Sequence, residues 1–389
     1  MSQSACAYFD CSATTPVDDA VLAAMLPYFA ERFGNASGAY ALGRRARGAL
    51  ESARAEVAAV LGCLPGEVVF TSGGSESDNL ALRGAAHAMR DAGRGAHLIS
   101  SAIEHPAILA TLRDLEAEGF ETTLVAVDAF GRVDPERFLA AARPDTVVAS
   151  LMLANNEVGT LQPLERIGPA LRARGVVVHT DAVQAAAYHA LDVDALGVDL
   201  LSLSAHKAYG PKGVGALYVR AGTPLCPCQT GGSQEGGRRA GTENVAFAVG
   251  LARALSLAAE RRDAETARLT ALRERIVGAL TELPGVRLTG HPSERLPGHV
   301  SIAVSGVRAD VLLLGLDMRG IAASSGSACS SGKVSASHVL TAMGVADEEA
   351  HGALRLSMGA CTSEADVDRL LDVLPGLIGR LRGVAMAAA

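Results

Sequence analysis

Residues 68–89 read "VVFTSGGSESDNLALRGAAHAM" and contain a strand, a turn and a helix whose order recurs along the chain. Residues 68–71 are β-branched or aromatic, which predicts a short buried strand. Gly73 and Gly74 follow it, and a helical pattern begins there. Glycines let the backbone approach an anion closely, and a helix start offers unpaired N–H groups, so this turn is a candidate anion site. An ordinary tight turn between a strand and a helix would have the same sequence.

The alternation of strand and helix continues beyond this turn. Further apolar runs lie at 97–101, 123–127, 146–152, 176–181 and 199–204, most of them followed by a helical stretch. This order predicts an α/β fold with a mostly parallel sheet covered by helices on both faces. Ligands on such sheets bind at the carboxyl ends of the strands.

The remaining chain predicts a second, smaller α+β domain. A long helix is expected over 243–282, and a strand over 300–304 follows a junction rich in Gly and Pro. We expect a large domain over 16–262 and a small domain over 263–389 that also includes 1–15.

A helix is also expected near the N-terminus, in "TTPVDDAVLAAMLPYFAERFG". Thr15 can cap it, Pro16 suits the first helical position and Gly34 would end it.

Composition excludes several classes of protein. The chain has 389 residues, of which 49% are hydrophobic and 20% charged, with a net charge of −7. This charge opposes binding to nucleic acid or an anionic membrane. We expect neither a membrane span nor a secretory signal. The seven cysteines are scattered, and Cys226 and Cys228 lack a second pair at metal-ligand spacing, so we expect no metal and a cytoplasmic protein with reduced thiols.

Polar side chains follow four of the predicted strands. They are His105; Asn155 and Asn156; Asp181 and Gln184; and Ser204, His206 and Lys207. Each has an ordinary explanation as a cap or a loop residue. Because parallel strands end at one edge of a sheet, however, all of them are expected to converge on one site.

Lys207 carries the clearest chemical prediction in this group. The segment "AYGPKG" follows it and would fix its position. A lysine in a partly desolvated site loses proton affinity and becomes a nucleophilic amine that can form an imine. Asp181 could keep a pyridine nitrogen protonated, and the helix start at Gly74 could hold a phosphate. These are the groups that pyridoxal phosphate requires.

The chain resembles the cysteine desulfurases of the NifS/IscS group, within the class V aminotransferases and fold-type I pyridoxal-phosphate enzymes. The resemblance covers nearly the whole chain, through "YFDCSATTPVD", "FTSGGSESDNLA", "ANNEVGTLQP", "HTDAVQA", "SAHKAYGPKGVGALYV", "GRRAGTENV", "SSGSACSS" and "LRLSMG". It implies a seven-stranded-type sheet and the conversion of L-cysteine to L-alanine.

The resemblance also implies roles for individual residues. Lys207 matches the lysine that binds the cofactor covalently, and His105 the histidine that stacks on the ring and helps with proton transfer. Asp181 matches the partner of the ring nitrogen and Gln184 that of the ring hydroxyl. The remaining cofactor-binding matches are Gly74, Ser75, Asn156, Ser204, His206 and Thr242. Thr242 matches a threonine that reaches the neighbouring subunit, which implies a homodimer.

The same resemblance implies which residues bind the substrate and which residue accepts its sulfur. Arg355 and Asn156 match residues beside the substrate, and the arginine pairs with its carboxylate. Cys329 matches the catalytic cysteine, which takes the sulfur as a persulfide and passes it to a protein acceptor. The small residues of "SSGSACSSGK" suit a thiol that must move between two partners. Ala36, Gly38 and Tyr40 depart from the family pattern near the entrance.

Alternative functions remain at this point. One is another fold-type I enzyme, such as a selenocysteine lyase or an aminotransferase, because the fold alone does not separate them. Another is a catalytically silent sulfur-carrier subunit, against which Lys207, Asp181 and Cys329 argue. The acceptor could belong to iron–sulfur cluster assembly or to thiolation of tRNA, DNA or a cofactor.

Overall fold

The computed structural model describes residues 6–325 and 336–388, and a seven-stranded sheet forms its centre. The strand order is β2-β8-β7-β6-β5-β3-β4. Only β8 runs antiparallel to its two neighbours, and the other pairs are parallel. The predicted α/β fold with a mostly parallel sheet is therefore confirmed. The strands are β2 (Val68–Thr71), β3 (His97–Ser101), β4 (Glu121–Val125), β5 (Thr146–Ser150), β6 (Val177–Asp181), β7 (Leu200–Ser204) and β8 (Gly215–Val219).

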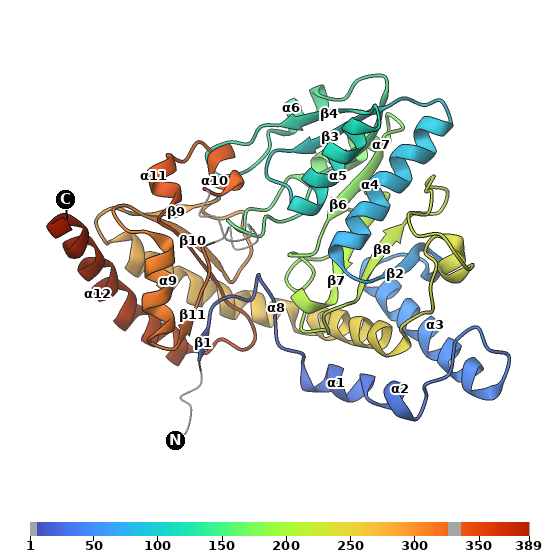
Figure 1. Ribbon diagram of the computed structural model, residues 1–389, viewed down its shortest axis with the longest axis horizontal. Helices are drawn as coiled ribbons and strands as arrows, with labels where there is room; N and C mark the ends of the chain where they lie inside the picture. Colours follow the sequence, from blue (N-terminus) through green and yellow to red (C-terminus); the bar gives the residue numbers. More distant parts are fainter. Residues whose placement is uncertain (1–5, 326–335, 389) are drawn as a thin grey trace.

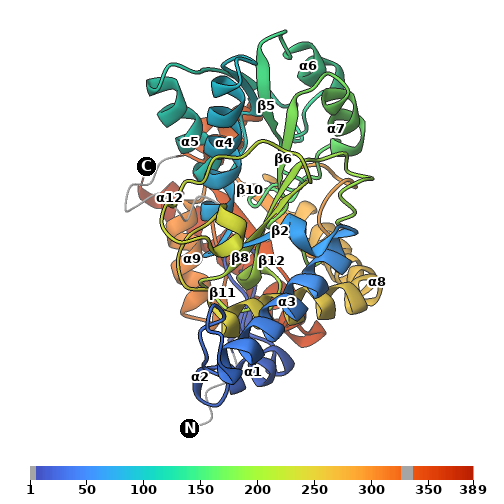
Figure 2. The ribbon, with the colours of Figure 1, turned by 90° about the vertical axis from the view of Figure 1, so that its right-hand side faces the viewer.

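Helices cover both faces of this sheet (Figure 2). Leu98 and Leu200 belong to a buried cluster with α4 (Gly74–Asp91) and α5 (Pro106–Ala117). The next residues, Ile99 and Leu201, belong to a cluster on the other face. That face is covered by α3 (Ala41–Leu61), α7 (Leu164–Arg172) and the first part of α8 (Val245–Thr281). Successive residues of a strand point to opposite faces, so strands buried on both faces read as continuous apolar runs.

The rest of the chain forms a smaller region around a three-stranded antiparallel sheet of order β12-β10-β9. The long helix α8 passes from the large sheet towards this region (Figure 1). The predicted boundary at 262/263 lies inside α8 and stays a prediction. The remaining elements are β1 (Ala7–Tyr8), α1 (Asp19–Met25), α2 (Pro27–Ala30), α6 (Pro135–Ala140), β9 (Val286–Thr289), β10 (His299–Val304), α9 (Ala309–Asp317), β11 (Ile321–Ala322), α10 (His338–Ala342), α11 (Asp347–Ala350), β12 (Ala353–Ser357) and α12 (Glu364–Ala388).

The N-terminal helix differs from its prediction. Helix α1 begins at Asp19 and is capped by Asp18, whose side chain accepts from the N–H of Ala20. Thr15 is not the cap, because its hydroxyl donates to the carbonyl of His206 at 3.0 Å and accepts from the N–H of Tyr209 at 2.9 Å. The Thr15 hydroxyl, which could have capped the helix locally, therefore makes long-range contacts instead.

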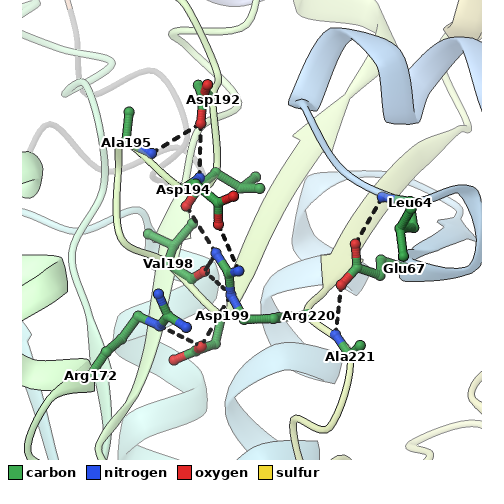
Figure 3. A network of polar contacts seen from close by, with 11 residues as sticks. Leu64, Glu67, Arg172, Asp192, Asp194, Ala195, Val198, Asp199, Arg220 and Ala221 are labelled. Carbon is green, nitrogen blue, oxygen red and sulfur yellow. Dashed lines mark hydrogen bonds and ion pairs between the residues drawn. The ribbon is translucent and has the colours of Figure 1, made fainter.

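A polar network joins the amino-terminal ends of β6 and β7 to the carboxyl end of β8 (Figure 3). It lies at the opposite ends of β6 and β7 from the predicted site residues. Asp199, just before β7, accepts from the N–H of Val178 at 3.0 Å and from Arg172 at 2.8 Å. Arg220, just after β8, donates to the carbonyl of Val198 and to Asp194. Its guanidinium also lies 3.5 Å from the Asp199 carboxylate. Among the described residues, no helix has the length and apolar character needed to cross a membrane.

This network predicts that replacing Asp199 and replacing Asp194, which both lie beside Arg220, lower the free energy of unfolding by different amounts. Asp199→Ala removes the acceptor of the buried Val178 N–H, and we expect it to lower the free energy of unfolding by about 2–4 kcal/mol. Asp194→Ala removes a partner whose side chain is 73% exposed, and we expect a loss below about 1 kcal/mol. Urea unfolding of both variants checks this, and equal losses would contradict it.

Candidate active site

The carboxyl ends of β3, β6 and β7 bring the predicted catalytic groups to one edge of the sheet. Asp181 is the last residue of β6, and Lys207 ends the short 3-10 helix η2 (Ala205–Lys207) that follows β7. His105 follows β3 and caps α5, where its Nδ1 accepts from the N–H of Ala107 at 3.1 Å. The ring proton of neutral His105 therefore lies on Nε2.

Lys207 is held by the N-terminal segment of the chain. Its Nζ donates to the carbonyl of Ser12 and, at 2.7 Å, to that of Ala13. The Gln184 side chain donates to the same Ser12 carbonyl at 3.0 Å. Carbonyl oxygens accept from an amine without forming an ion pair, so they fix the position of Nζ without supplying a counter-charge.

Three ionisable side chains gather within reach of one another beside this lysine. Ligand atoms of Asp78, His105 and Asp181 all lie within 4.8 Å of each other. Burial raises the pKa of Asp181, while His105 and Lys207 oppose the shift. Burial lowers the pKa of His105. Two carboxyls in a desolvated site favour a bound cation or a protonated ring nitrogen.

Asp78 was not among the sequence predictions. It is 1% exposed, its Oδ1 has no hydrogen-bond partner among the described residues, and burial raises its pKa well above the usual value. His179 Nε2 lies 3.7 Å from that oxygen and also contacts the Ser202 hydroxyl at 2.9 Å. The only sequence signal was an acidic residue in the first turns of a helix that is otherwise apolar on its sheet-facing side.

The glycine turn before α4 faces the end of β7. A Cβ added at Gly74 would lie 2.8 Å from the Val183 side chain, and one added at Gly73 would lie 3.8 Å from the Ser204 hydroxyl. The first N–H groups of a helix have no partner within the helix, and here they open beside Ser204. Ser75 is exposed in the first turn. This geometry is that of an anion cradle.

His206 directly precedes Lys207 in η2. Its Nδ1 contacts the Thr14 hydroxyl at 3.2 Å. Burial, with help from the charge of Lys207, lowers its pKa to about 4. His206 is therefore neutral near pH 7.

Arg355 lies in β12, within the smaller sheet, and reaches towards the site. Its guanidinium donates to the carbonyl of Asn156 at 3.0 Å and to the Asp10 carboxylate at 2.6 Å. Arg355 is 4% exposed, and its Nε has no hydrogen-bond partner among the described residues. Sequence reasoning missed Asp10, because nothing local connects it to an arginine so distant in the chain.

Two predicted residues are not brought to this site by the described chain. Cys329 lies outside the described residues. Its flanking segments are fixed nearby, since Ser324 exchanges backbone hydrogen bonds with Arg355 and the Ser337 hydroxyl donates to Glu157 at 2.5 Å. Thr242 is exposed in the loop before α8, and its predicted contact requires a second subunit.

Comparison with known proteins decides the family. The profile of the aminotransferase class-V family matches residues 7–370. The chain belongs to the aminotransferase class-V family. The sequence is 47% identical over 378 residues to the cysteine desulfurase IscS of Methanosarcina thermophila, with 97% of this chain and 93% of that protein covered. The predicted resemblance to the NifS/IscS group is confirmed.

Two similar solved structures agree with this assignment. A NifS-like protein superposes with a TM-score of 0.90 and 37% identity, over 96% of this chain and 100% of that one. A structure described as SspA in complex with cysteine gives a TM-score of 0.80 and 36% identity, over 90% and 98% of the two chains.

The residues present fit the pyridoxal phosphate on which class-V enzymes of this kind depend. A fixed amine, a buried carboxyl and a glycine-lined helix start lie at one sheet edge, and Asp78 Oδ1 and Arg355 Nε are buried polar atoms without partners among the described residues. Asp78, His105 and Asp181 are also close enough to share a metal ion. The expectation of no metal stays a prediction.

The buried His299 next to this site predicts a pH dependence of stability. Its ring contacts the Ser12 hydroxyl and the Glu157 carbonyl, and burial lowers its pKa from 6.5 to about 3. Between pH 6.5 and 3, His299 is therefore protonated in the unfolded chain but neutral in the folded chain. Through this residue, the free energy of unfolding is unaffected above pH 6.5 and falls as pH drops towards 3, by up to about 1.4 kcal/mol per pH unit.

Urea unfolding of the wild type and of His299→Gln at several pH values checks this. We expect a shallower fall of unfolding free energy below pH 6.5 in the variant. Equal slopes in the two proteins would contradict the assignment.

Proposed function

We propose that this protein is a pyridoxal-phosphate-dependent cysteine desulfurase. It converts L-cysteine to L-alanine and transfers the sulfur to Cys329 as a persulfide. The observation that carries the proposal is the Lys207 amine, fixed by two carbonyls at the same sheet edge as the buried Asp181 and the neutral His105. The names of the relatives, and a neighbouring structure that contains cysteine, support the substrate.

Each of these residues has a task set by its surroundings. Pyridoxal phosphate, when bound, supplies a ring that delocalises the negative charge left on the substrate α-carbon. Lys207 anchors the cofactor through Nζ, and Asp181 holds a proton at the ring nitrogen by its negative charge. His105 holds a proton at Nε2 beside Asp181 and can donate it.

The glycine turn and the groups beside it would hold the phosphate of the cofactor. Gly74 and Ser75 offer backbone N–H groups at the start of α4, and Ser204 and His206 complete the cradle from the end of β7. Gln184 would pair with the ring hydroxyl, and Thr242 of a neighbouring subunit would close the cradle in a homodimer.

Arg355 binds the substrate carboxylate, with Asn156 beside it. A planar guanidinium can form two parallel hydrogen bonds to a carboxylate, which fixes the orientation of the substrate as well as its charge. The Asp10 carboxylate occupies one edge of this guanidinium in the structure. The Nε of the same guanidinium has no hydrogen-bond partner among the described residues, so it can donate to a substrate carboxylate beside Asp10.

Cys329 passes the sulfur from the pocket to a protein acceptor in the cytoplasm. The names of the relatives are compatible with iron–sulfur cluster assembly, and thiolation of tRNA, DNA or a cofactor uses the same chemistry. A selenocysteine lyase or an aminotransferase on this fold is the second candidate, but an aminotransferase has no need of a thiol in this segment.

The function is tested with Cys329→Ser and Lys207→Ala. We expect Cys329→Ser to keep the visible absorbance of bound pyridoxal phosphate and to lose sulfide release from L-cysteine, because only the acceptor thiol is gone. Lys207→Ala should lose both. Mass spectrometry of the wild type after turnover should show one added sulfur on Cys329. Full sulfide release by Cys329→Ser would contradict the persulfide step.

Arg355→Lys tests the carboxylate contact. A lysine keeps the charge but loses the planar pair of donors, so we expect KM for L-cysteine to rise about 10- to 100-fold with a smaller change in kcat. Cysteamine, which lacks the carboxylate, serves as the matched probe. If Arg355→Lys weakened cysteamine binding as much as cysteine binding, the assigned contact would be wrong.

A further inference from the structure

Two cysteines that the proposed reaction does not use lie face to face beside the site. The Sγ atoms of Cys11 and Cys361 are 3.8 Å apart, although the residues are separated by 350 positions in the chain. Neither forms a disulfide in this structure. Cys11 lies between β1 and α1, and Cys361 lies in the loop between β12 and α12.

The backbone around both thiols is fixed, which makes their approach a property of the fold. Cys11 donates its N–H to the carbonyl of Ser357 at 3.1 Å, and the N–H of Ser12 bonds the Ser357 hydroxyl at 2.9 Å. Arg268 donates to the carbonyls of Gly359 and Thr362, on either side of Cys361.

Gly359 allows the two thiols to meet. A Cβ at this position would lie 2.9 Å from Cys11 Sγ and 2.0 Å from the Tyr209 hydroxyl. Only a residue without a side chain therefore lets the loop pass over Cys11.

The two thiols differ in access and in acidity. Cys361 is exposed, and Cys11 is 6% exposed. A hydrogen bond from Cys11 lowers the pKa of Cys361, whereas that contact and burial raise the pKa of Cys11. Thiolates are the reactive form of cysteine, so Cys361 is the thiol that an external oxidant meets first.

We propose that Cys11 and Cys361 are a redox-active thiol pair that a hydroperoxide converts into an intramolecular disulfide. The Cys361 thiolate attacks the O–O bond, which gives a sulfenic acid on Cys361 and releases water or an alcohol. The Cys11 thiol then attacks that sulfur and displaces water. The two thiols lose two electrons in total, and the O–O bond gains them.

Disulfide formation would move the segment that holds Lys207. The sulfur atoms must close from 3.8 Å to about 2.05 Å. The residues after Cys11 are Ser12 and Ala13, whose carbonyls hold Lys207 Nζ. The oxidised protein therefore holds Lys207 differently, and this consequence rests on the proposed function, whereas the disulfide itself does not.

The disulfide is tested on full-length protein carrying Cys329→Ser, so that the predicted catalytic thiol cannot react. After treatment with hydrogen peroxide, we expect the intact mass to fall by two hydrogens and a peptide linking Cys11 to Cys361 to appear. A thiol reductant should reverse both changes. Adding Cys361→Ser should abolish the linked peptide, and adding Cys228→Ser, an exposed thiol elsewhere, should leave it.

The consequence for Lys207 is measured on the same samples by the rate of the absorbance change when L-cysteine is added. We expect this rate to fall several-fold after oxidation, and to be unaffected by peroxide when Cys361→Ser is present. If Cys11 and Cys361 both stay alkylatable after peroxide, the thiol pair is wrong. If the linked peptide forms without any absorbance change in either state, the pair stands and the proposed function fails.

Discussion

The amine of Lys207 imposes the constraint on which the arrangement of this molecule depends. A half-buried amine needs acceptors, and here they are the carbonyls of Ser12 and Ala13, far away in the sequence. That segment is itself held by Ser357 at the end of β12. The large and the small sheets are thus joined through the contacts of the Lys207 amine.

The sequence was sufficient for features whose physics is local. Apolar runs such as 199–204 predicted strands buried on both faces, and the glycines after residue 71 predicted the turn into α4. Because parallel strands end at one edge, residues such as His105 and Asp181 could be assigned to a single site before their distances were known. The match of several motifs in order then added Arg355, which lies in a different sheet.

Features that depend on distant partners could not be predicted. Thr15 has every local property of a helix cap, yet His206 and Tyr209 engage its hydroxyl instead. Asp10 and Asp78 are unremarkable acidic residues in the sequence, and only the fold gives them Arg355 and His179 as neighbours. Periodicity reports which face of an element is buried. It does not indicate which polar group from a distant part of the chain will contact that face.

If Arg355 binds the substrate carboxylate as proposed, its contact with Asp10 sets how much charge alone contributes to substrate binding. An arginine with no counter-ion would attract any anion, with an affinity that falls steeply as salt is added. Asp10 already compensates part of this charge, so under the proposed function a bound anion would gain less electrostatic free energy here than at a lone arginine. Binding energy must then come from the other groups of an amino acid. Under the proposed function, the Asp10–Arg355 pair would therefore lower the affinity for simple inorganic anions and leave selection to the shape and the other polar groups of the substrate.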